Sequence, residues 1–232
     1  MADSLLLWDI DGTLVNTDRA GERSLLIVIR DLYQRDLGDK LPVQLQGRTD
    51  TSIVRDLLNF LGVPVTPEEE KRLLDGYVAS LPRMLPAGKA RVHAGIREAL
   101  DAVHAHPEIH QGLLTGNQKE GARLKLSHLD LWHYFEFGAY AEDSHIRDEL
   151  GPFALSRARE KLGIDFPPER VFVIGDTPHD VACGKAIGAK TIAVATGSFS
   201  VADLEACYPT HTFADLSDTN ALLKVILKDL AS

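Results

Sequence analysis

The chain has 232 residues, of which 44% are hydrophobic and 25% are charged, and its formal net charge is −9. This length suits one large domain, or a core domain with a smaller insert, and allows a substantial buried core. The negative charge and the lack of a basic cluster argue against nucleic acid or an anionic membrane as the main partner.

Neither membrane insertion nor secretion is indicated by the sequence. No stretch is apolar over the length needed to span a bilayer, and residues 1–4 lack the basic region of a signal peptide. The two cysteines, Cys183 and Cys207, do not have the spacing of metal ligands. We therefore expect a cytoplasmic protein with reduced cysteines, in which Cys183 is a packing residue.

The first predicted element is a buried strand over residues 5–8, an apolar run that leads into Asp9 and Asp11. Ligands of doubly wound sheets bind at the carboxyl ends of the strands, so both carboxylates lie where chemistry usually takes place. Both could be ordinary turn acids. However, an unpaired carboxylate beside buried residues is costly, and two close carboxylates repel each other. A divalent cation such as Mg²⁺ would relieve both problems, because it prefers oxygen ligands.

The next segment, residues 17–87, is predicted to be helical and to contain no clear strand. Apolar residues at helical spacing and a proline-bearing N-cap sequence at Thr66 support this prediction. Three helices are expected, over residues 18–36, 51–61 and 67–85. Pro86 and Gly88 then end the helical region.

From residue 88 onward, predicted helices and strands alternate. Helices are expected over residues 95–105, 119–129, 152–162, 178–187 and 216–230. Strands are expected over residues 111–115, 135–141, 171–174 and 191–195. Such alternation predicts βαβ units and a parallel sheet covered by helices on both faces. The sequence therefore predicts one α/β domain that is interrupted by a helical insert after its first strand.

Two of the later predicted strands also end in polar residues beside a glycine. The strand at residues 111–115 ends in Thr115, and a hydroxyl there could bind an oxyanion or could cap the next helix. The strand at residues 171–174 leads into Asp176 and Asp180. These acids could hold a metal, or they could favour the N-terminus of the next helix.

The motifs at these strand ends resemble those of a known family. Residues 9–14 (DIDGTL) resemble the DxDGT signature of the haloacid dehalogenase superfamily of hydrolases, and residues 175–180 (GDTPHD) resemble its GDTxxD motif. Residues 114–117 (LTGN) resemble the element between them. The resemblance implies a Rossmann-like, three-layer parallel-sheet core, here residues 1–16 and 88–232. It also implies that the helical insert, residues 17–87, is a cap over the active site.

The same resemblance implies roles for the residues of these motifs. Asp9 would be the nucleophile, Asp11 the general acid and base, and Thr115 a ligand of the phosphoryl group. The implied cofactor is Mg²⁺, held by Asp9, Asp176 and the main-chain carbonyl of Asp11, with Asp180 as a ligand or as a group that orients one. Further contacts with the substrate are expected from Gly12, Thr13, Gly116 and Asn117.

Two arginines complete the candidate site. Many superfamily members have a lysine–proline pair before the last motif, whereas residues 145–152 of this chain hold Arg147 as the only cation apart from a histidine. Arg147 could replace the lysine, because arginine stays charged and can fork onto carboxylate or phosphate, or it could pair with a surface acid. Arg48 lies in a segment, residues 47–54, that looks like the cap of phosphoglycolate-phosphatase-like members. It could bind a substrate carboxylate or phosphate, or it could be a surface arginine that precedes a helix.

The expected function is Mg²⁺-dependent hydrolysis of a small phosphate monoester through an aspartyl-phosphate, with phosphoglycolate as a candidate by analogy. A phosphomutase uses the same core motifs and remains the main alternative. Asp11 argues against a haloacid dehalogenase, which needs no general acid. The presence of Asp9, Asp11 and Asp176 argues against a non-catalytic phosphate-binding module. The expected partner is a small phosphorylated metabolite, and the expected assembly is a monomer or a homodimer.

Overall fold

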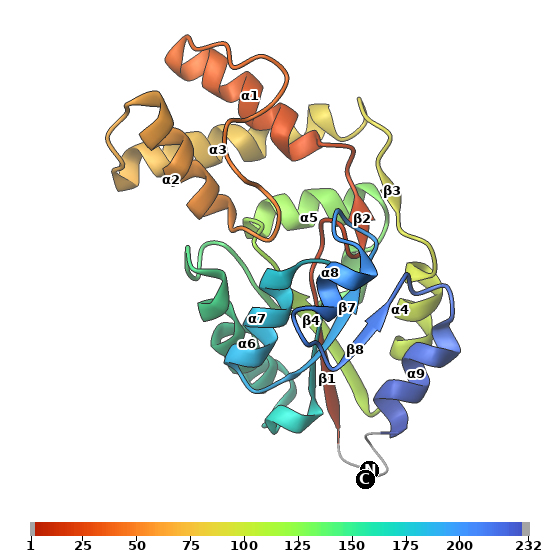
Figure 1. Ribbon diagram of the computed structural model, residues 1–232. Helices are drawn as coiled ribbons and strands as arrows, with labels where there is room; N and C mark the ends of the chain where they lie inside the picture. The colour runs from red at the N-terminus through yellow and green to blue at the C-terminus, as the bar shows by residue number, and fades with distance from the viewer. Residues whose placement is uncertain (1–2, 229–232) are drawn as a thin grey trace.

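The computed structural model describes residues 3–228, and a six-stranded parallel sheet forms its centre (Figure 1). The strand order is β5-β4-β1-β6-β7-β8. The bounds are β1 Ser4–Trp8, β4 Ile109–Leu114, β5 Gly138–Ala139, β6 Val171–Gly175, β7 Lys190–Val194 and β8 His211–Phe213. β1 lies between β4 and β6 and is buried along its whole length, which explains its continuous apolar sequence.

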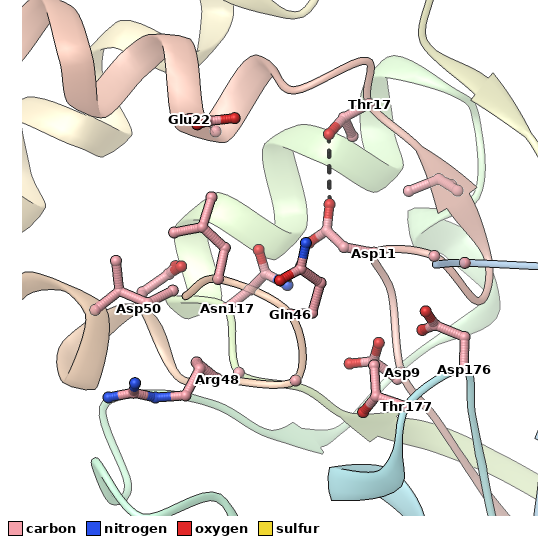
Figure 2. A pocket seen from close by; sticks show the side chains of 18 of the residues that line it. Asp9, Asp11, Thr17, Glu22, Gln46, Arg48, Asp50, Asn117, Asp176 and Thr177 are labelled. Carbon is pink, nitrogen blue, oxygen red and sulfur yellow. Dashed lines mark hydrogen bonds between the residues drawn. The ribbon is translucent and has the colours of Figure 1, made fainter. Parts of the chain in front are cut away.

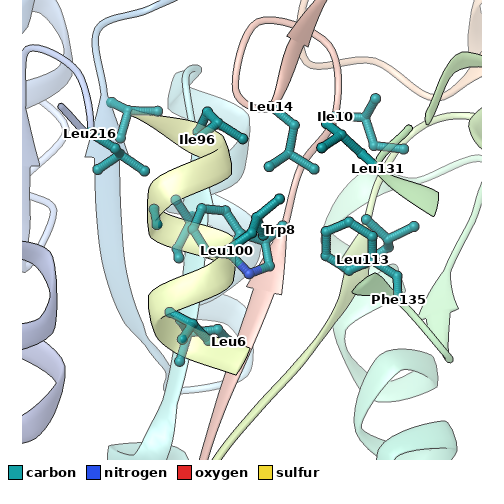
Figure 3. Close-up of a cluster of buried hydrophobic side chains, with 14 of the residues drawn as sticks. Leu6, Trp8, Ile10, Leu14, Ile96, Leu100, Leu113, Leu131, Phe135 and Leu216 are labelled. Atoms are coloured by element: carbon teal, nitrogen blue, oxygen red, sulfur yellow. The ribbon is translucent and has the colours of Figure 1, made fainter. Parts of the chain in front are cut away.

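Helices cover both faces of the sheet, as the alternating pattern predicts. Leu6 and Trp8 of β1 pack on one face, against α4 (Ile96–His104), α5 (Lys119–His128) and α9 (Thr219–Lys228) (Figure 3). Leu5 and Leu7 point to the other face, against α6 (Leu150–Leu162) and α7 (Pro178–Ala186). This division follows from the period of two of a strand. The prediction of an α/β fold with a three-layer parallel-sheet core is confirmed.

The helical segment between the first two strands of this sheet forms three α-helices, close to the predicted bounds. These are α1 (Ala20–Tyr33), α2 (Asp50–Leu61) and α3 (Pro67–Met84), grouped together at one end of the molecule (Figure 1). They bury an apolar cluster of their own, which includes Val28, Leu57 and Leu81. A two-stranded antiparallel ribbon of β2 (Val15–Asn16) and β3 (Arg91–Val92) lies where the chain enters and leaves this segment.

Several local predictions were wrong. The strand expected over residues 135–141 is reduced to the two residues of β5, because only these two pair with β4. The residues before it, 132–134, form a 3₁₀ turn, η1 (Trp132–Tyr134). β2, β3, β8 and the short helix α8 (Val201–Glu205) were not predicted. The helix expected over residues 216–230 begins at Thr219, and residues 229–230 of that prediction lie outside the described residues.

Two further short helices precede β6, namely η2 (Arg147–Glu149) and η3 (Pro168–Arg170).

Within residues 3–228, no helix is both long enough and apolar enough to cross a membrane.

Candidate active site

The candidate site lies at the carboxyl ends of three neighbouring strands. Asp9 follows β1, Thr115 follows β4 and Asp176 follows β6, and these strands are adjacent in the order β4-β1-β6. Residues far apart in the sequence are therefore brought to one edge of the sheet. Asp9 and Asp176 lie close together in the close-up of this region (Figure 2).

Three buried carboxylates form the centre of the site. Asp9, Asp176 and Asp180 each offer an oxygen atom, and these atoms lie within 4.8 Å of one another. The side-chain hydroxyl of Thr13 donates a hydrogen bond to Asp176 at 3.0 Å. Asp180 accepts hydrogen bonds from the backbone and the hydroxyl of Thr177, so it also caps α7. The capping role expected of Asp180 is therefore shown, and its place in the acidic cluster leaves the expected metal role open.

Arg147 is buried beside this cluster. Its guanidinium donates to Asp9 at 2.8 Å and also to Asp180. The alternative that Arg147 pairs only with a surface acid is wrong, because its side chain is 7% exposed and both of these partners are buried. The short helix η2, which begins at Arg147, directs this side chain inward.

The electrostatics of the cluster suit a divalent cation. Burial raises the pKa of Asp9 to about 7, although the Arg147 guanidinium opposes the rise. Burial, followed by the charges of Asp180 and Asp9, raises the pKa of Asp176 well above its usual value. Three carboxylates share one guanidinium among the described neighbours, so negative charge is in excess. Oxygen ligands and excess negative charge fit Mg²⁺.

The side chain of Asp11 turns away from the acidic cluster. Its Oδ1 accepts a long hydrogen bond of 3.4 Å from Thr17, as Figure 2 shows. Its Oδ2 accepts hydrogen bonds from Asn117 at 2.8 Å and from Lys125 at 2.5 Å. Asp11 could therefore contribute to a metal site only through its main chain, as the sequence analysis expects.

Lys125 of α5 was missed by the sequence analysis. The side chain is buried, and burial alone would lower its pKa, but the charges of Asp11 and Asp50 and the hydrogen bond to Asp11 raise it above its usual value. A signal was present in the sequence. Lys125 lies four residues after Gly121 and next to Leu126, on the buried side of an amphipathic helix where a charged residue is unusual.

The remaining predicted residues are at the site, and most of them already have partners. Asn117 donates to the hydroxyl of Thr115 at 2.8 Å. The backbone N–H of Gly12 donates to Val15, and its carbonyl accepts a hydrogen bond from Thr196. A Cβ at Gly12 would lie 2.4 Å from a carboxylate oxygen of Asp176, so this glycine leaves room for the acidic cluster.

The loop before α2 closes over the core from the helical segment. The backbone N–H of Asp50 donates to the carbonyl of Gly116 at 2.6 Å, and the carboxylate of Asp50 accepts from the backbone of Gln118 at 2.8 Å. Arg48 lies in the same loop, but its guanidinium pairs with Asp56 at 2.9 Å and also bonds Ser52. In Figure 2 its side chain extends away from Asp9 and Asp176.

A cavity of about 500 Å³ lies between the helical segment and the sheet. It is bounded on the sheet side by Asp9, Asp11 and Asp176, and on the helical side by Glu22, Gln46 and Arg48. Lys125 and Arg147 also line it. The arrangement offers a carboxylate next to a fixed cation, with a second carboxylate facing the same space.

Comparison with known proteins identifies the family to which the chain belongs. A family model described as haloacid dehalogenase-like hydrolase matches residues 6–194. The chain is 26% identical over 235 residues to "Pyrophosphatase PpaX" of Bacillus mycoides (strain KBAB4), with 97% of this chain and 99% of that protein covered. It is 27% identical over 229 residues to "Probable phosphatase IndB" of Dickeya dadantii (strain 3937), with 95% of each covered.

A solved structure shows the same fold. A predicted phosphoglycolate phosphatase from Haemophilus somnus 129PT aligns with a TM-score of 0.67 at 18% identity, over 95% of this chain and 98% of that one. The fold and the family match together define the class: the chain belongs to the haloacid dehalogenase-like hydrolases. It is an enzyme of this hydrolase family, and the two relatives named above are called a pyrophosphatase and a probable phosphatase.

Proposed function

We propose that the protein is a Mg²⁺-dependent phosphatase that hydrolyses a small phosphate monoester through an aspartyl-phosphate on Asp9. One observation carries this proposal: Asp9 pairs with the guanidinium of Arg147 at 2.8 Å on the wall of a cavity that Asp11 also lines. A nucleophilic carboxylate, a fixed cation and a second carboxylate are the groups that two-step phosphoryl transfer requires.

The reaction would proceed in two steps. In the first step a carboxylate oxygen of Asp9 attacks phosphorus, and the bond between phosphorus and the leaving oxygen breaks. Asp11 gives a proton to that oxygen, which leaves as an alcohol. In the second step Asp11 takes a proton from water, the water oxygen attacks phosphorus, and inorganic phosphate leaves Asp9. Arg147 and Thr115 would hold the phosphoryl oxygens.

Mg²⁺ would be held by Asp9, Asp176 and the main-chain carbonyl of Asp11, with Asp180 as a further ligand or as an orienting group. When bound, it offsets the repulsion between the nucleophile and the phosphate. The close approach of three buried carboxylates supports this assignment.

Residues 17–87 would act as a cap, with the remainder of the chain as the core domain. The separate apolar cluster of α1, α2 and α3 and the β2–β3 ribbon at the two crossing points support this division. Hinges near residues 16–17 and 87–88 would let the cap open for substrate and close to exclude water.

The cavity volume favours a small phosphorylated metabolite as the substrate. Phosphoglycolate is one candidate. Inorganic pyrophosphate, which the name of the Bacillus relative indicates, is a phosphoanhydride rather than a monoester and is the alternative; its leaving group would be phosphate instead of an alcohol. A phosphomutase shares the first step and differs in returning the phosphoryl group to a sugar. We expect a cytoplasmic monomer or homodimer.

A panel of phosphate esters together with pyrophosphate, assayed with Mg²⁺ for release of inorganic phosphate, tests the function. We expect phosphate release by the wild type and none by Asp9→Asn. Asp31→Asn, at an exposed carboxylate on α1, is the matched control and should behave as the wild type. Conversion of one sugar phosphate into its isomer without phosphate release would favour the mutase. Wild-type activity in Asp9→Asn would contradict the nucleophile assignment.

A further inference from the structure

Lys125 is a buried cation for which neither the proposed mechanism nor the family motifs supply a role. Its side chain is only 5% exposed, and its ammonium group donates to Asp11 at 2.5 Å and to the side-chain carbonyl of Asn117 at 2.5 Å. Burying an ammonium group is costly unless it is paired and hydrogen-bonded. These contacts are made within the cavity wall, so the arrangement serves the site rather than the surface of α5.

The two oxygens of the Asp11 carboxylate have different surroundings. Oδ2 accepts two short hydrogen bonds, one from Lys125 and one from Asn117. Among the described residues, Oδ1 accepts one hydrogen bond, a long one of 3.4 Å from Thr17. A carboxylate oxygen that already accepts two strong donors is a poor site for a further proton. Proton exchange with a substrate therefore falls to Oδ1.

Asn117 is itself held in place by Lys125. Its side-chain carbonyl accepts from Lys125, which directs the amide N–H groups toward Asp11 and the hydroxyl of Thr115. Lys125 thus contacts Oδ2 directly and also orients the second donor to the same atom. Removal of the Lys125 ammonium group would take away one donor to Oδ2 of Asp11 and the contact that orients the other donor, Asn117.

We propose that Lys125 is a positioning residue that fixes the carboxylate of Asp11, so that Oδ1 faces the cavity and exchanges the proton with the leaving group. This inference rests on the proposed function, because it assumes that Asp11 is the general acid. It assigns no contact between Lys125 and the phosphoryl group. The cap contributes to the arrangement, since the hydroxyl of Thr17, at the start of the cap, donates to Oδ1 of Asp11.

The test compares two aryl phosphates of similar shape, phenyl phosphate and 2,4-dinitrophenyl phosphate. Phenolate is a poor leaving group and needs a proton, whereas dinitrophenolate leaves readily without one. Single-turnover release of the phenol is measured with Mg²⁺ for the wild type, Asp11→Asn and Lys125→Met. We expect Lys125→Met to slow release from phenyl phosphate by about tenfold or more relative to release from the dinitrophenyl ester, which is part of the usual contribution of a general acid.

A merely structural role would slow release from both esters equally. Lys125→Arg keeps the buried charge and should restore part of the lost ratio. Lys119→Met, at an exposed lysine on the same helix, should keep the wild-type ratio and is the matched control. Thermal unfolding checks each variant, and Lys125→Gln replaces Lys125→Met if the latter does not fold.

The outcomes separate this inference from the proposed function. A wild type that releases phenol from neither ester, or an Asp11→Asn variant with the wild-type ratio, would overturn the assignment of function or of the general acid. If Asp11→Asn changes the ratio but the Lys125 variants keep the wild-type ratio, the positioning role of Lys125 is wrong and the proposed function stands.

Discussion

Arg147 is the residue on which the charge balance of the acidic cluster depends. It lies between two buried carboxylates, Asp9 and Asp180, which would otherwise face each other. A single guanidinium nitrogen of Arg147, Nη2, donates to both carboxylates. The structure thus explains how a site without the family's usual lysine retains a fixed cation next to Asp9, the proposed nucleophile.

We predict that Arg147→Ala lowers kcat/KM by about 2–4 kcal/mol of transition-state stabilisation, the range found for the loss of one key oxyanion donor. Arg147→Lys should recover part of this loss, because the positive charge returns but the planar donor geometry of the guanidinium does not. Steady-state kinetics on the best substrate of the panel measures both. Arg159→Ala, at an exposed arginine of α6, is the control. A kcat/KM for Arg147→Ala that equals that of the control would show that Arg147 does not serve the reaction.

Asp50 makes the stability of the protein depend on pH. Burial raises the pKa of this carboxyl to about 6 in the folded protein, whereas its usual value is 3.8. Between these values the folded state binds more protons than the unfolded state, so the free energy of unfolding falls as pH rises. We predict that, between about pH 4 and pH 6, the free energy of unfolding of Asp50→Asn falls less steeply with pH than that of the wild type. Urea unfolding of both proteins in chelator, at several pH values, measures it; equal slopes would contradict the prediction.

The loop that precedes α2 shows how one element completes the site of another. The carbonyl of Arg48 would lie 2.2 Å from a Cβ placed on Gly116, and Asp50 donates to the carbonyl of the same glycine. The loop can therefore contact the core only because residue 116 has no side chain. Asp50 then accepts a hydrogen bond at the start of α5, where a carboxylate is favoured.

We predict that Gly116→Ala displaces this loop and lowers kcat/KM by about 10²-fold, a loss typical of misplacing catalytic groups by about 1 Å. Gly121→Ala is the matched control, because a Cβ there would meet Leu81 and Tyr77 at ordinary contact distances of 3.6 and 3.7 Å. It should keep wild-type activity and gain slight helix stability. Kinetics and thermal unfolding of both variants measure the difference. Equal activities would show that the close approach of the loop is not required.

Binding of the proposed metal ion would connect the site to the stability of the whole molecule. The acidic cluster joins residues after β1 and β6, and it is assembled only in the folded chain. A ligand that binds only the folded state stabilises it by an amount that grows with concentration, about 2.7 kcal/mol at one hundred times its Kd. The proposed Mg²⁺ site therefore has a readout that is independent of activity.

We predict that Mg²⁺ raises the Tm of the chelator-treated protein and restores its activity. Asp176→Asn should lose both effects, whereas Asp203→Asn, at an exposed carboxylate on α8, should keep them. Differential scanning calorimetry and a phosphate-release assay measure the two effects. Full activity in excess chelator, after removal of the metal is verified, would contradict the metal-dependent mechanism.

The strands and helices that could be predicted from the sequence are those with strong local signals. β1 and β6 are buried on both faces and are therefore continuous apolar runs. α3 begins with the cap, proline and glutamates expected at a helix N-terminus. β5 and β8 are edge strands of two and three residues, and segments this short carry no periodic pattern by which they could be recognised.

The sequence by itself determined the fold class, the family and the order of the aspartate-bearing strand ends, because these depend on short motifs and local hydrophobic pattern. Only the tertiary structure decided which charges meet. Lys125 is 114 residues from Asp11, and Arg147 is 138 residues from Asp9. Such pairs form because parallel strands bring distant segments to one edge of the sheet, where burial makes an unpaired charge costly. That cost depends on neighbours in space, which local pattern does not encode.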